Sequence, residues 1–218
     1  MPRKIARVYL YVVDHDLGFA PNPYYGVCTL ATCKPRIRST AQVGDWIIGL
    51  GGTSLKATGK CIFAMRVTRK ITFNHYWLDP EFNDKKPVRN GSKKMLTGDN
   101  IYYLDDKAKW HQAPSIHSEP DGSVSQLNLK RDTKSSNVLL STHFYYFGSA
   151  ALPLPDGMLQ ALGYVNRIDH RVFKQPLANP LIQWLENEYQ DSLNLVLADP
   201  FDFDKADKHY SLKTNRMV

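Results

Sequence analysis

The sequence has 218 residues, of which 43% are hydrophobic and 22% are charged, a balance that is ordinary for a folded globular protein. This composition argues against intrinsic disorder, and no apolar run approaches the roughly 20 residues that a membrane-spanning helix needs. The first residues carry charge and lack the apolar core of a signal peptide, so we expect a cytoplasmic protein without membrane contact. Three cysteines are an odd number for a disulfide scaffold, and we expect free thiols.

The net charge of +7 is unevenly distributed along the chain. Residues 1–100 hold 16 Lys and Arg against 7 Asp and Glu, whereas residues 101–218 hold 12 against 14. A basic half favours a polyanionic partner, because Lys and Arg that neutralise phosphates release condensed counterions. A solvated basic surface without such a partner is the alternative, and the charge alone favours neither.

The N-terminal part of the chain predicts several strands. Residues 7–13 are β-branched and aromatic, which indicates a buried strand, and residues 18–26 contain two prolines and two glycines, which indicate an irregular aromatic loop. Residues 27–31 fit a short strand or a helical turn. Residues 43–50 predict a tight turn that leads into a strand, and residues 61–68 predict another strand. We expect these strands to form an antiparallel β core.

The middle of the chain predicts less regular structure. Residues 72–80 indicate a helical turn that ends at a proline, and residues 81–100 a long basic loop. Strand character returns at residues 100–104 and 137–147, and the polar stretch of residues 105–136 between them is expected to be mostly loop.

The C-terminal third predicts helical structure. A short apolar pattern covers residues 158–162, and Asn179 and Pro180 fit the N-cap and first position of a helix that continues to about residue 191. We therefore expect an α+β protein in which residues 1–150 form one domain. Residues 151–218 are expected to form a helical extension that packs on the same core.

An aromatic loop followed by a basic cluster favours a pocket for a base or nucleotide. Aromatic rings stack on bases with about 1–3 kcal/mol each, amides and hydroxyls read base edges, and Lys and Arg hold phosphates. The candidates for base binding are Phe19, Asn22, Tyr24, Thr32, Cys33, Trp46 and Asn100. The candidates for phosphate binding are Lys34, Arg36, Arg38, Lys93 and Lys94. In the alternative interpretation the rings fill the core and the polar residues cap turns.

Four residues are candidates for a nucleophile or an acid–base group, namely Cys33, Asp45, Asp99 and His117. Cys33 directly precedes Lys34, and a nearby cation lowers the pKa of a thiol. Carboxylates and imidazoles beside a flipped base suit proton transfer. The spacings of Cys and His match no zinc pattern, and the glycine-rich phosphate-binding motifs are missing, so we expect no metal and no cofactor.

Several unusual clusters occur in one order between residues 7 and 150. They lie at residues 18–23, 28–38, 43–46, 64–68 and 98–102. In these clusters the sequence resembles the nucleotide-modification-associated domain family, second type. The resemblance implies a link to DNA base hypermodification in phages and bacteria, without a defined reaction.

A second resemblance concerns the turn Gly44-Asp45, the hydrophobic strand that follows it and the strand at residues 61–68. This pattern is similar to PUA and EVE-like domains, which implies a small antiparallel β-barrel with helices around it and a pocket for a modified base. The favoured hypothesis is thus a protein that recognises a modified base or nucleotide in DNA. The alternatives are an enzyme that installs, edits or removes a base modification, and a module that binds an acidic protein. RNA as the partner and the oligomeric state stay open here.

Overall fold

The computed structural model describes residues 5–165 and 169–218, which form two compact units. Unit 1 consists of Met1–Asp16, Ala41–Arg69 and Ser141–Phe201, as far as these are described. Unit 2 consists of Leu17–Thr40, Lys70–Leu140 and Asp202–Val218. Both units contain residues from before and after residue 150, and the expected boundary at that position stays a prediction.

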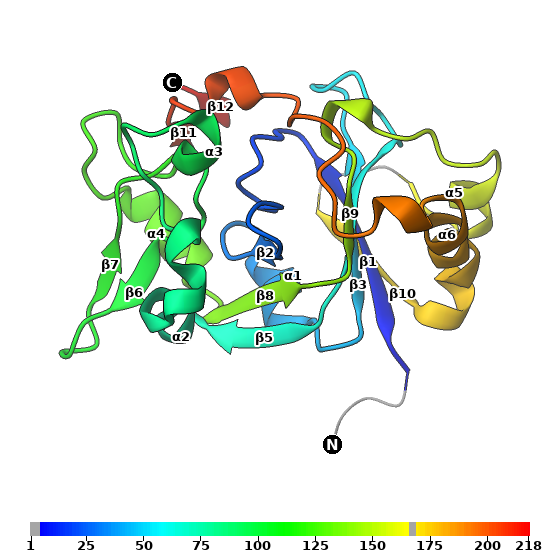
Figure 1. Ribbon diagram of the computed structural model, residues 1–218, viewed down its shortest axis with the longest axis horizontal. Helices are drawn as coiled ribbons and strands as arrows, with labels where there is room; N and C mark the ends of the chain where they lie inside the picture. The colour runs from blue at the N-terminus through cyan, green and yellow to red at the C-terminus, as the bar shows by residue number, and fades with distance from the viewer. Residues whose placement is uncertain (1–4, 166–168) are drawn as a thin grey trace. The chain divides into compact units, whose positions relative to one another are not determined.

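Unit 1 is built on a five-stranded sheet with the strand order β10-β1-β3-β4-β9 (Figure 1). Its strands are β1 Arg7–Val13, β3 Trp46–Gly51, β4 Cys61–Arg66, β9 Phe144–Tyr146 and β10 His170–Lys174. β1 pairs in parallel with β3, whereas the other neighbouring strands are antiparallel. The strands expected within residues 7–13, 43–50 and 61–68 are confirmed, and the sheet that they form is mixed and open.

The mixed α+β class is confirmed, but the described residues contain no closed barrel, so the PUA-like barrel is not found. The expectation of a purely antiparallel core was wrong for β1 and β3. Adjacent strands joined by a short turn are antiparallel, whereas a long connection lets the chain return in the same direction. Between β1 and β3 the chain runs through β2 and α1 of unit 2, and this length permits the parallel pairing.

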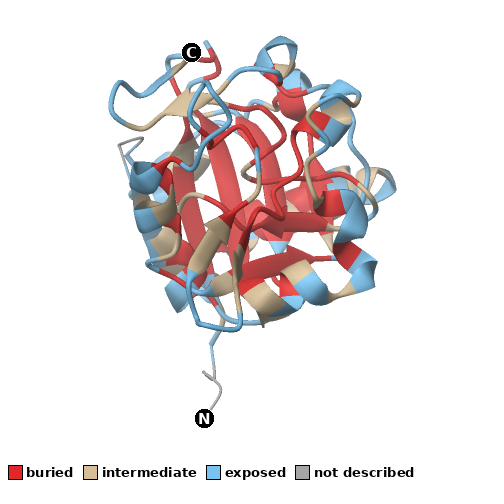
Figure 2. Ribbon diagram, turned by 90° about the vertical axis from the view of Figure 1, so that its left-hand side faces the viewer, coloured by how far each residue is buried: buried red, intermediate tan, exposed pale blue. Residues whose placement is uncertain are grey.

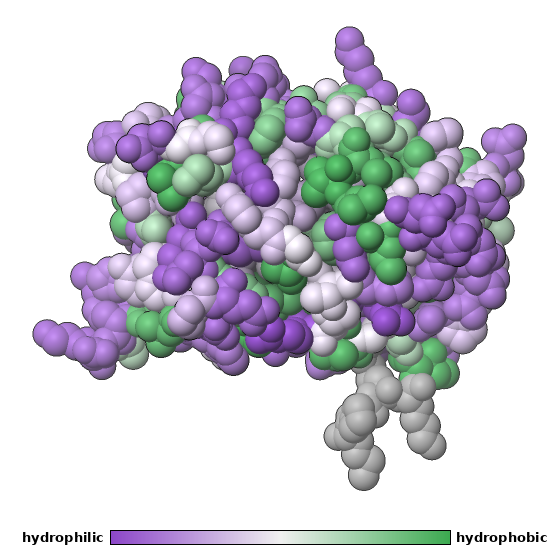
Figure 3. All heavy atoms as spheres, in the orientation of Figure 1, coloured by the Kyte–Doolittle hydropathy of each residue, from purple (hydrophilic) through white to green (hydrophobic). Residues whose placement is uncertain are grey.

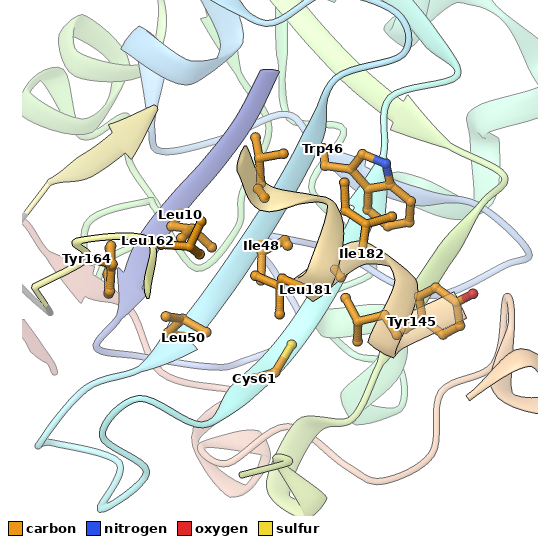
Figure 4. Packing of buried hydrophobic residues seen from close by; sticks show 14 of the residues in the cluster. Leu10, Trp46, Ile48, Leu50, Cys61, Tyr145, Leu162, Tyr164, Leu181 and Ile182 are labelled. Atoms are coloured by element: carbon orange, nitrogen blue, oxygen red, sulfur yellow. The ribbon is translucent and has the colours of Figure 1, made fainter. Parts of the chain in front are cut away.

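Helices α5 Met158–Ala161 and α6 Gln175–Glu188 pack on the core of unit 1. Figure 4 shows Leu181 and Ile182 of α6 against Ile48 and Trp46 of β3. The helix starts earlier than the sequence indicated, because Pro176 occupies its first turn, where proline has no hydrogen bond to lose. Pro180 lies inside the helix and removes one backbone hydrogen bond there.

Unit 2 contains a three-stranded sheet in the order β2-β8-β5 and two hairpins, β6–β7 and β11–β12. Its strands are β2 Cys28–Leu30, β5 Arg69–Thr72, β6 Tyr102–Leu104, β7 Trp110–Gln112, β8 Asn137–Ser141, β11 Tyr210–Ser211 and β12 Arg216–Met217. Its α-helices are α1 Pro35–Thr40, α2 Phe73–Leu78, α3 Lys93–Leu96 and α4 Gln126–Asp132. Short 3-10 helices occupy Pro80–Lys85 and Phe203–Lys205 in unit 2 and Gly148–Ala150 and Gln190–Ser192 in unit 1.

Two stretches that were expected to be loops are more regular. Residues 81–100 contain α3 and most of a 3-10 helix, and residues 105–136 contain β7 and α4. These elements are short and polar, so they lack the apolar periodicity by which a sequence reveals a helix or strand. α2 confirms the helical turn expected at residues 72–80.

The core of unit 2 is largely aromatic. Phe73, Tyr76, Phe82 and Tyr102 are buried and meet mainly by edge-to-face or tilted contacts, such as Phe73 with Tyr102 and Tyr76 with Phe82. Edge-to-face pairs add about 0.5–1.5 kcal/mol beyond the area that they bury. Figure 2 shows buried backbone concentrated in the strands and exposure concentrated in helices and loops.

Hydrophilic side chains cover much of the face drawn in Figure 3, with hydrophobic ones between them in separate patches. In unit 1, the consecutive residues Leu195, Val196 and Leu197 are exposed. Among residues 5–165 and 169–218, no helix combines the length and the apolar character needed to cross a membrane.

Candidate functional site

Cys33 lies in the short connection between β2 and α1 of unit 2. Its φ is 55° and that of Lys34 is 36°, so two consecutive residues adopt the left-handed region. A non-glycine residue in such a conformation costs roughly 1–3 kcal/mol, so the surrounding contacts must hold this turn in place. Pro35 then starts α1 with a φ that suits a helix. The sharp turn leaves Cys33 partly exposed, unlike Cys28 and Cys61.

The side chain of Arg38 holds the turn. This fully buried residue donates from Nε to the carbonyl oxygen of Cys33 at 2.9 Å. Its Nη1 donates to the carbonyl oxygens of Ser135 at 3.0 Å and Asn137 at 2.7 Å, and its Nη2 donates to that of Asp132. One guanidinium thus ties the Cys33 turn to the end of α4 and the start of β8. Because Arg38 is buried and bonded to backbone, the phosphate contact expected for it does not fit the structure.

His117 and Asp132 lie next to Cys33. The Sγ atom of Cys33 is 3.8 Å from Nε2 of His117, and Nδ1 of His117 is 2.9 Å from Oδ2 of Asp132. The hydroxyl of Tyr102 donates to the same carboxylate oxygen at 3.0 Å. His117 and Asp132 are both buried. Thiol, imidazole and carboxylate therefore form one chain, in which the imidazole can take the proton of the nucleophile while the carboxylate orients it.

The second oxygen of the Asp132 carboxylate binds two further groups. The backbone N–H of Cys33 donates to Oδ1 of Asp132 at 3.0 Å, and Nε of Arg131 donates to it at 2.8 Å. Nη2 of Arg131 lies 3.5 Å from the sulfur of Cys33. Asp132 thus positions the backbone of the nucleophile, the imidazole and a guanidinium at once.

The charges of this cluster favour a thiolate. Burial opposes ionisation of Cys33, but the neighbouring charges of Arg131 and His117 outweigh burial, so the pKa of the thiol lies below its ordinary value. Burial likewise disfavours the imidazolium form of His117, but Asp132 and Cys33 reverse this effect and raise the pKa of His117. Burial alone would raise the pKa of Asp132, whereas His117 and Arg131 hold it well below its usual range. Both shifts act in the direction of a thiolate–imidazolium pair, beside a carboxylate that stays ionised.

The other two thiols contrast with Cys33. Burial raises the pKa of Cys28 to about 12, and burial also raises the pKa of Cys61. We therefore expect iodoacetamide to alkylate Cys33 selectively in the folded protein. The alkylation rate is proportional to the thiolate fraction. The rate at pH 7, divided by the maximal rate at high pH, should therefore be larger for Cys33 than for free cysteine, which ionises near pH 8.5.

Peptide mass spectrometry after alkylation between pH 5 and pH 10 measures this profile for each cysteine. A Cys33 profile that coincides with that of free cysteine would contradict the depressed pKa. Equal labelling of Cys28 and Cys61 in the folded protein would contradict their burial.

The aromatic candidates for base stacking are buried. Phe19 is 3% exposed and meets the ring of His117 edge-on, with 4.7 Å between the ring centroids. Tyr24 is 8% exposed, and Trp46 is 1% exposed in the core of unit 1. Such burial leaves no open ring face for a base, so base stacking on these residues does not fit the structure. Phe19 instead fixes the plane of the imidazole of His117.

The polar candidates Asn22, Asp99 and Asn100 belong to a buried network of unit 2 with Thr29, Tyr76 and Lys85. Asp99 accepts hydrogen bonds of 2.7 Å from the hydroxyls of Thr29 and Tyr76. Lys85 donates to Oδ1 of Asn22 at 2.7 Å, and burial lowers its pKa to about 8 despite the charge of Asp99. Nδ2 of Asn100 donates to the carbonyl oxygen of Tyr76 at 2.7 Å. These contacts lie within the fold, so the network holds the loops together.

In this network the buried Oδ1 of Asn100 lacks a hydrogen-bond partner among the described residues, and the same holds for the buried hydroxyl of Thr32, the residue before Cys33. Thr32 therefore keeps its place among the candidates for substrate contact, next to the reactive thiol.

The remaining cationic candidates form two groups. Lys34 and Arg36 follow Cys33 directly, and Arg36 is exposed on α1. Lys93 and Lys94 lie on α3, where the ammonium of Lys94 is 4.1 Å from the ring centre of Tyr25 and that of Lys93 is 5.8 Å from the ring centre of Phe203. The two groups thus lie on different segments of unit 2.

Asp45 is a structural residue of unit 1. Its Oδ1 accepts from the backbone N–H of Arg7 at 2.8 Å, and its Oδ2 accepts from that of Gln42 at 2.9 Å. Both oxygens thus stabilise the turn before β3.

Of the four catalytic candidates, the structure brings together Cys33 and His117, and it adds Asp132, Arg131 and Tyr102, which the sequence did not indicate.

Within the described part of the chain, no group of three or more His, Cys, Asp or Glu side chains is arranged to hold a metal ion. The side chains around Cys33 offer a polarised thiol, a proton carrier and a neighbouring guanidinium.

The comparisons with known proteins point to one family. Neither the curated proteins nor the solved structures contain a match to this chain. The likeness to PUA and EVE-like domains is not confirmed. A family model described as nucleotide modification associated domain 2 matches residues 5–207. This match covers nearly all of the chain, including Cys33, His117 and Asp132, and the chain therefore belongs to the nucleotide modification associated domain 2 family.

Proposed function

We propose that the chain is a cysteine-dependent enzyme of nucleotide modification, which forms or breaks a bond between a base in DNA and an attached group. The observation that carries this proposal is the Cys33–His117–Asp132 geometry. Family membership supports a role in nucleotide modification. The buried rings of Phe19, Tyr24 and Trp46 give little support to a protein that only reads a base by stacking.

In the proposed reaction, the Cys33 thiolate attacks an electrophilic carbon such as an amide or ester carbonyl. A carbon–sulfur bond forms, and the electron pair of the carbonyl moves to its oxygen. His117, protonated by the thiol, then gives its proton to the departing amine or alcohol, which leaves a thioester on Cys33. Water or an amine on the acceptor attacks the thioester, His117 accepts a proton, and the thiolate is released. Asp132 orients His117 throughout and does not itself take up a proton.

The test is mass spectrometry of nucleosides after incubation of the protein with DNA that carries modified or unmodified bases. We expect the wild-type protein to change the mass of a nucleoside, and Cys33→Ala to lower the rate by roughly 10³-fold or more. Cys28→Ala is the matched control, because this thiol is buried away from solvent and should leave the rate within about twofold. Intact-mass analysis should reveal an adduct on Cys33 during turnover.

If Cys33→Ala changed the nucleoside mass at the same rate as the wild-type protein, the proposed role of Cys33 would be wrong. If the wild-type protein and Cys33→Ala bound modified DNA equally and neither changed a nucleoside, the function would be recognition of the base.

A further inference from the structure

Arg131 is held beside the nucleophile with hydrogen-bonding capacity to spare. Its Nε donates to Asp132, and its Nη2 reaches the sulfur of Cys33 at 3.5 Å. Among the described residues no acceptor is reported for its Nη1. The side chain is 20% exposed, and the ring centre of Tyr210 lies 5.7 Å from its Cζ. Nη2 also lies 3.3 Å from Nε2 of His117, so Nη1 is the part of the guanidinium that the described contacts leave available.

The charges around Cys33 do not cancel. Arg38 and Arg131 are cations and Asp132 is an anion, while proton transfer between Cys33 and His117 leaves the sum of their charges unchanged. The cluster therefore carries a net charge of +1 in either protonation state. Since an uncompensated charge in a buried environment is costly, this excess favours a bound anion.

The backbone N–H of the nucleophile itself is not available to a substrate. The N–H of Cys33 already donates to Oδ1 of Asp132 at 3.0 Å. Nη1 of Arg131 is therefore a donor close to the reacting sulfur that can bind a substrate oxygen. A guanidinium edge matches a carboxylate by two parallel hydrogen bonds.

We propose that Arg131 binds a carboxylate carried by the substrate close to the carbon that Cys33 attacks. This inference rests on the proposed function and names its substrate class, a base substituent or a transferred group of the amino-acid or 2-oxo-acid type. Because Nη2 lies 3.5 Å from the sulfur, an oxygen held by Nη2 at about 2.9 Å lies no more than about 6.4 Å from the sulfur. A carboxylate next to the reacting carbon fits this span, whereas the 5′-phosphate of a nucleotide is separated from its base by the sugar.

Alkylation with two small reagents tests the proposal without a known substrate. Iodoacetate and iodoacetamide differ only in carrying a carboxylate or an amide next to the reacting carbon. Each reaction forms a thioether from the thiolate and releases iodide. The ratio of the iodoacetate rate to the iodoacetamide rate cancels the thiolate fraction, so it reports on the carboxylate alone. We expect this ratio at Cys33 to exceed that of free cysteine by about tenfold, with a rate that saturates in iodoacetate.

Variants of Arg131 connect the ratio to the guanidinium. Arg131→Gln should return the ratio to that of free cysteine, and Arg131→Lys should retain only part of the preference, because an ammonium lacks the two parallel donors. Lys130→Gln, which removes an exposed cation from α4, the helix that carries Arg131, should leave the ratio unchanged. Circular dichroism at the assay temperature shows whether each variant is folded. If a variant is unfolded, the comparison of the wild-type ratio with that of free cysteine still tests the proposal.

Competition separates the two sources of an anion. Acetate should slow alkylation by iodoacetate more than inorganic phosphate does at equal ionic strength. Stronger protection by phosphate would overturn the carboxylate assignment, and so would a wild-type ratio equal to that of free cysteine. Slow alkylation by iodoacetamide itself would contradict the activated thiol and hence the proposed function, so the two failures are distinguishable.

Discussion

Replacing Arg38 with Met is expected to lower the free energy of unfolding by about 3–5 kcal/mol, as measured by urea denaturation. Methionine fills much of the same volume but donates no hydrogen bond. The carbonyl oxygens of Cys33, Asp132, Ser135 and Asn137 would then lose the donors that now bind them. A buried acceptor without a partner costs about 1–3 kcal/mol, and relaxation of the turn limits the total.

Arg36→Met on the same helix is the matched control, because Arg36 is exposed and its replacement should change the free energy of unfolding by less than about 0.5 kcal/mol. Equal effects of the two substitutions would show that Arg38 does not hold the turn. Where Arg38→Met remains folded, its Cys33 should react more slowly with iodoacetamide at pH 7, because the turn that places the thiol beside His117 is no longer fixed.

His117→Ala is expected to slow turnover by about 10²- to 10⁴-fold, the range typical of a lost general acid–base group. It should also slow alkylation of Cys33 at pH 7 by about tenfold. The imidazolium lowers the pKa of the thiol, so its removal raises that pKa and reduces the thiolate fraction at neutral pH. Raising the pH increases the thiolate fraction of both proteins, so the difference between their alkylation rates should shrink.

His111→Ala is the control, because it removes another histidine from the segment between β6 and α4 that contains His117. His111 pairs with Asp105 at 2.9 Å and stacks on Tyr103, with no reported contact to Cys33, so neither rate should change. If His117→Ala alkylated at the wild-type rate at pH 7, Arg131 alone would account for the reactive thiol, and His117 would have no part in activating it.

The strands of unit 1 were predictable because their residues have a marked pattern. β1, β3 and β4 are short apolar runs bounded by charge or glycine, and each appears close to its expected position. The pairing of β1 with β3 was not predictable, since it depends on where a long connection returns. α4 was missed because Gln126–Asp132 contains two leucines among polar residues and shows no apolar stripe.

The candidate site was predictable only in part. Cys33 was a candidate because it precedes Lys34, and His117 was one because imidazoles carry protons. The two residues lie 84 positions apart in the sequence, and no spacing rule links them. Asp132 and Arg131 lie at the end of α4, which the sequence did not predict, so no sequence pattern indicated that they belong to the site. The burial of Trp46 and Phe19 was not predictable for a related reason. An aromatic residue in a loop or beside a turn has the same sequence signature whether it faces a ligand or the core.

The interleaving of the two units limits how the chain can be divided. A fragment that ended at residue 150 would lack β10 and α6, the edge strand and main helix of unit 1. It would also lack Tyr210, against which the Arg131 guanidinium lies, and the β11–β12 hairpin of unit 2. We therefore expect an insertion or fusion to be tolerated better at an exposed loop than at the midpoint of the chain.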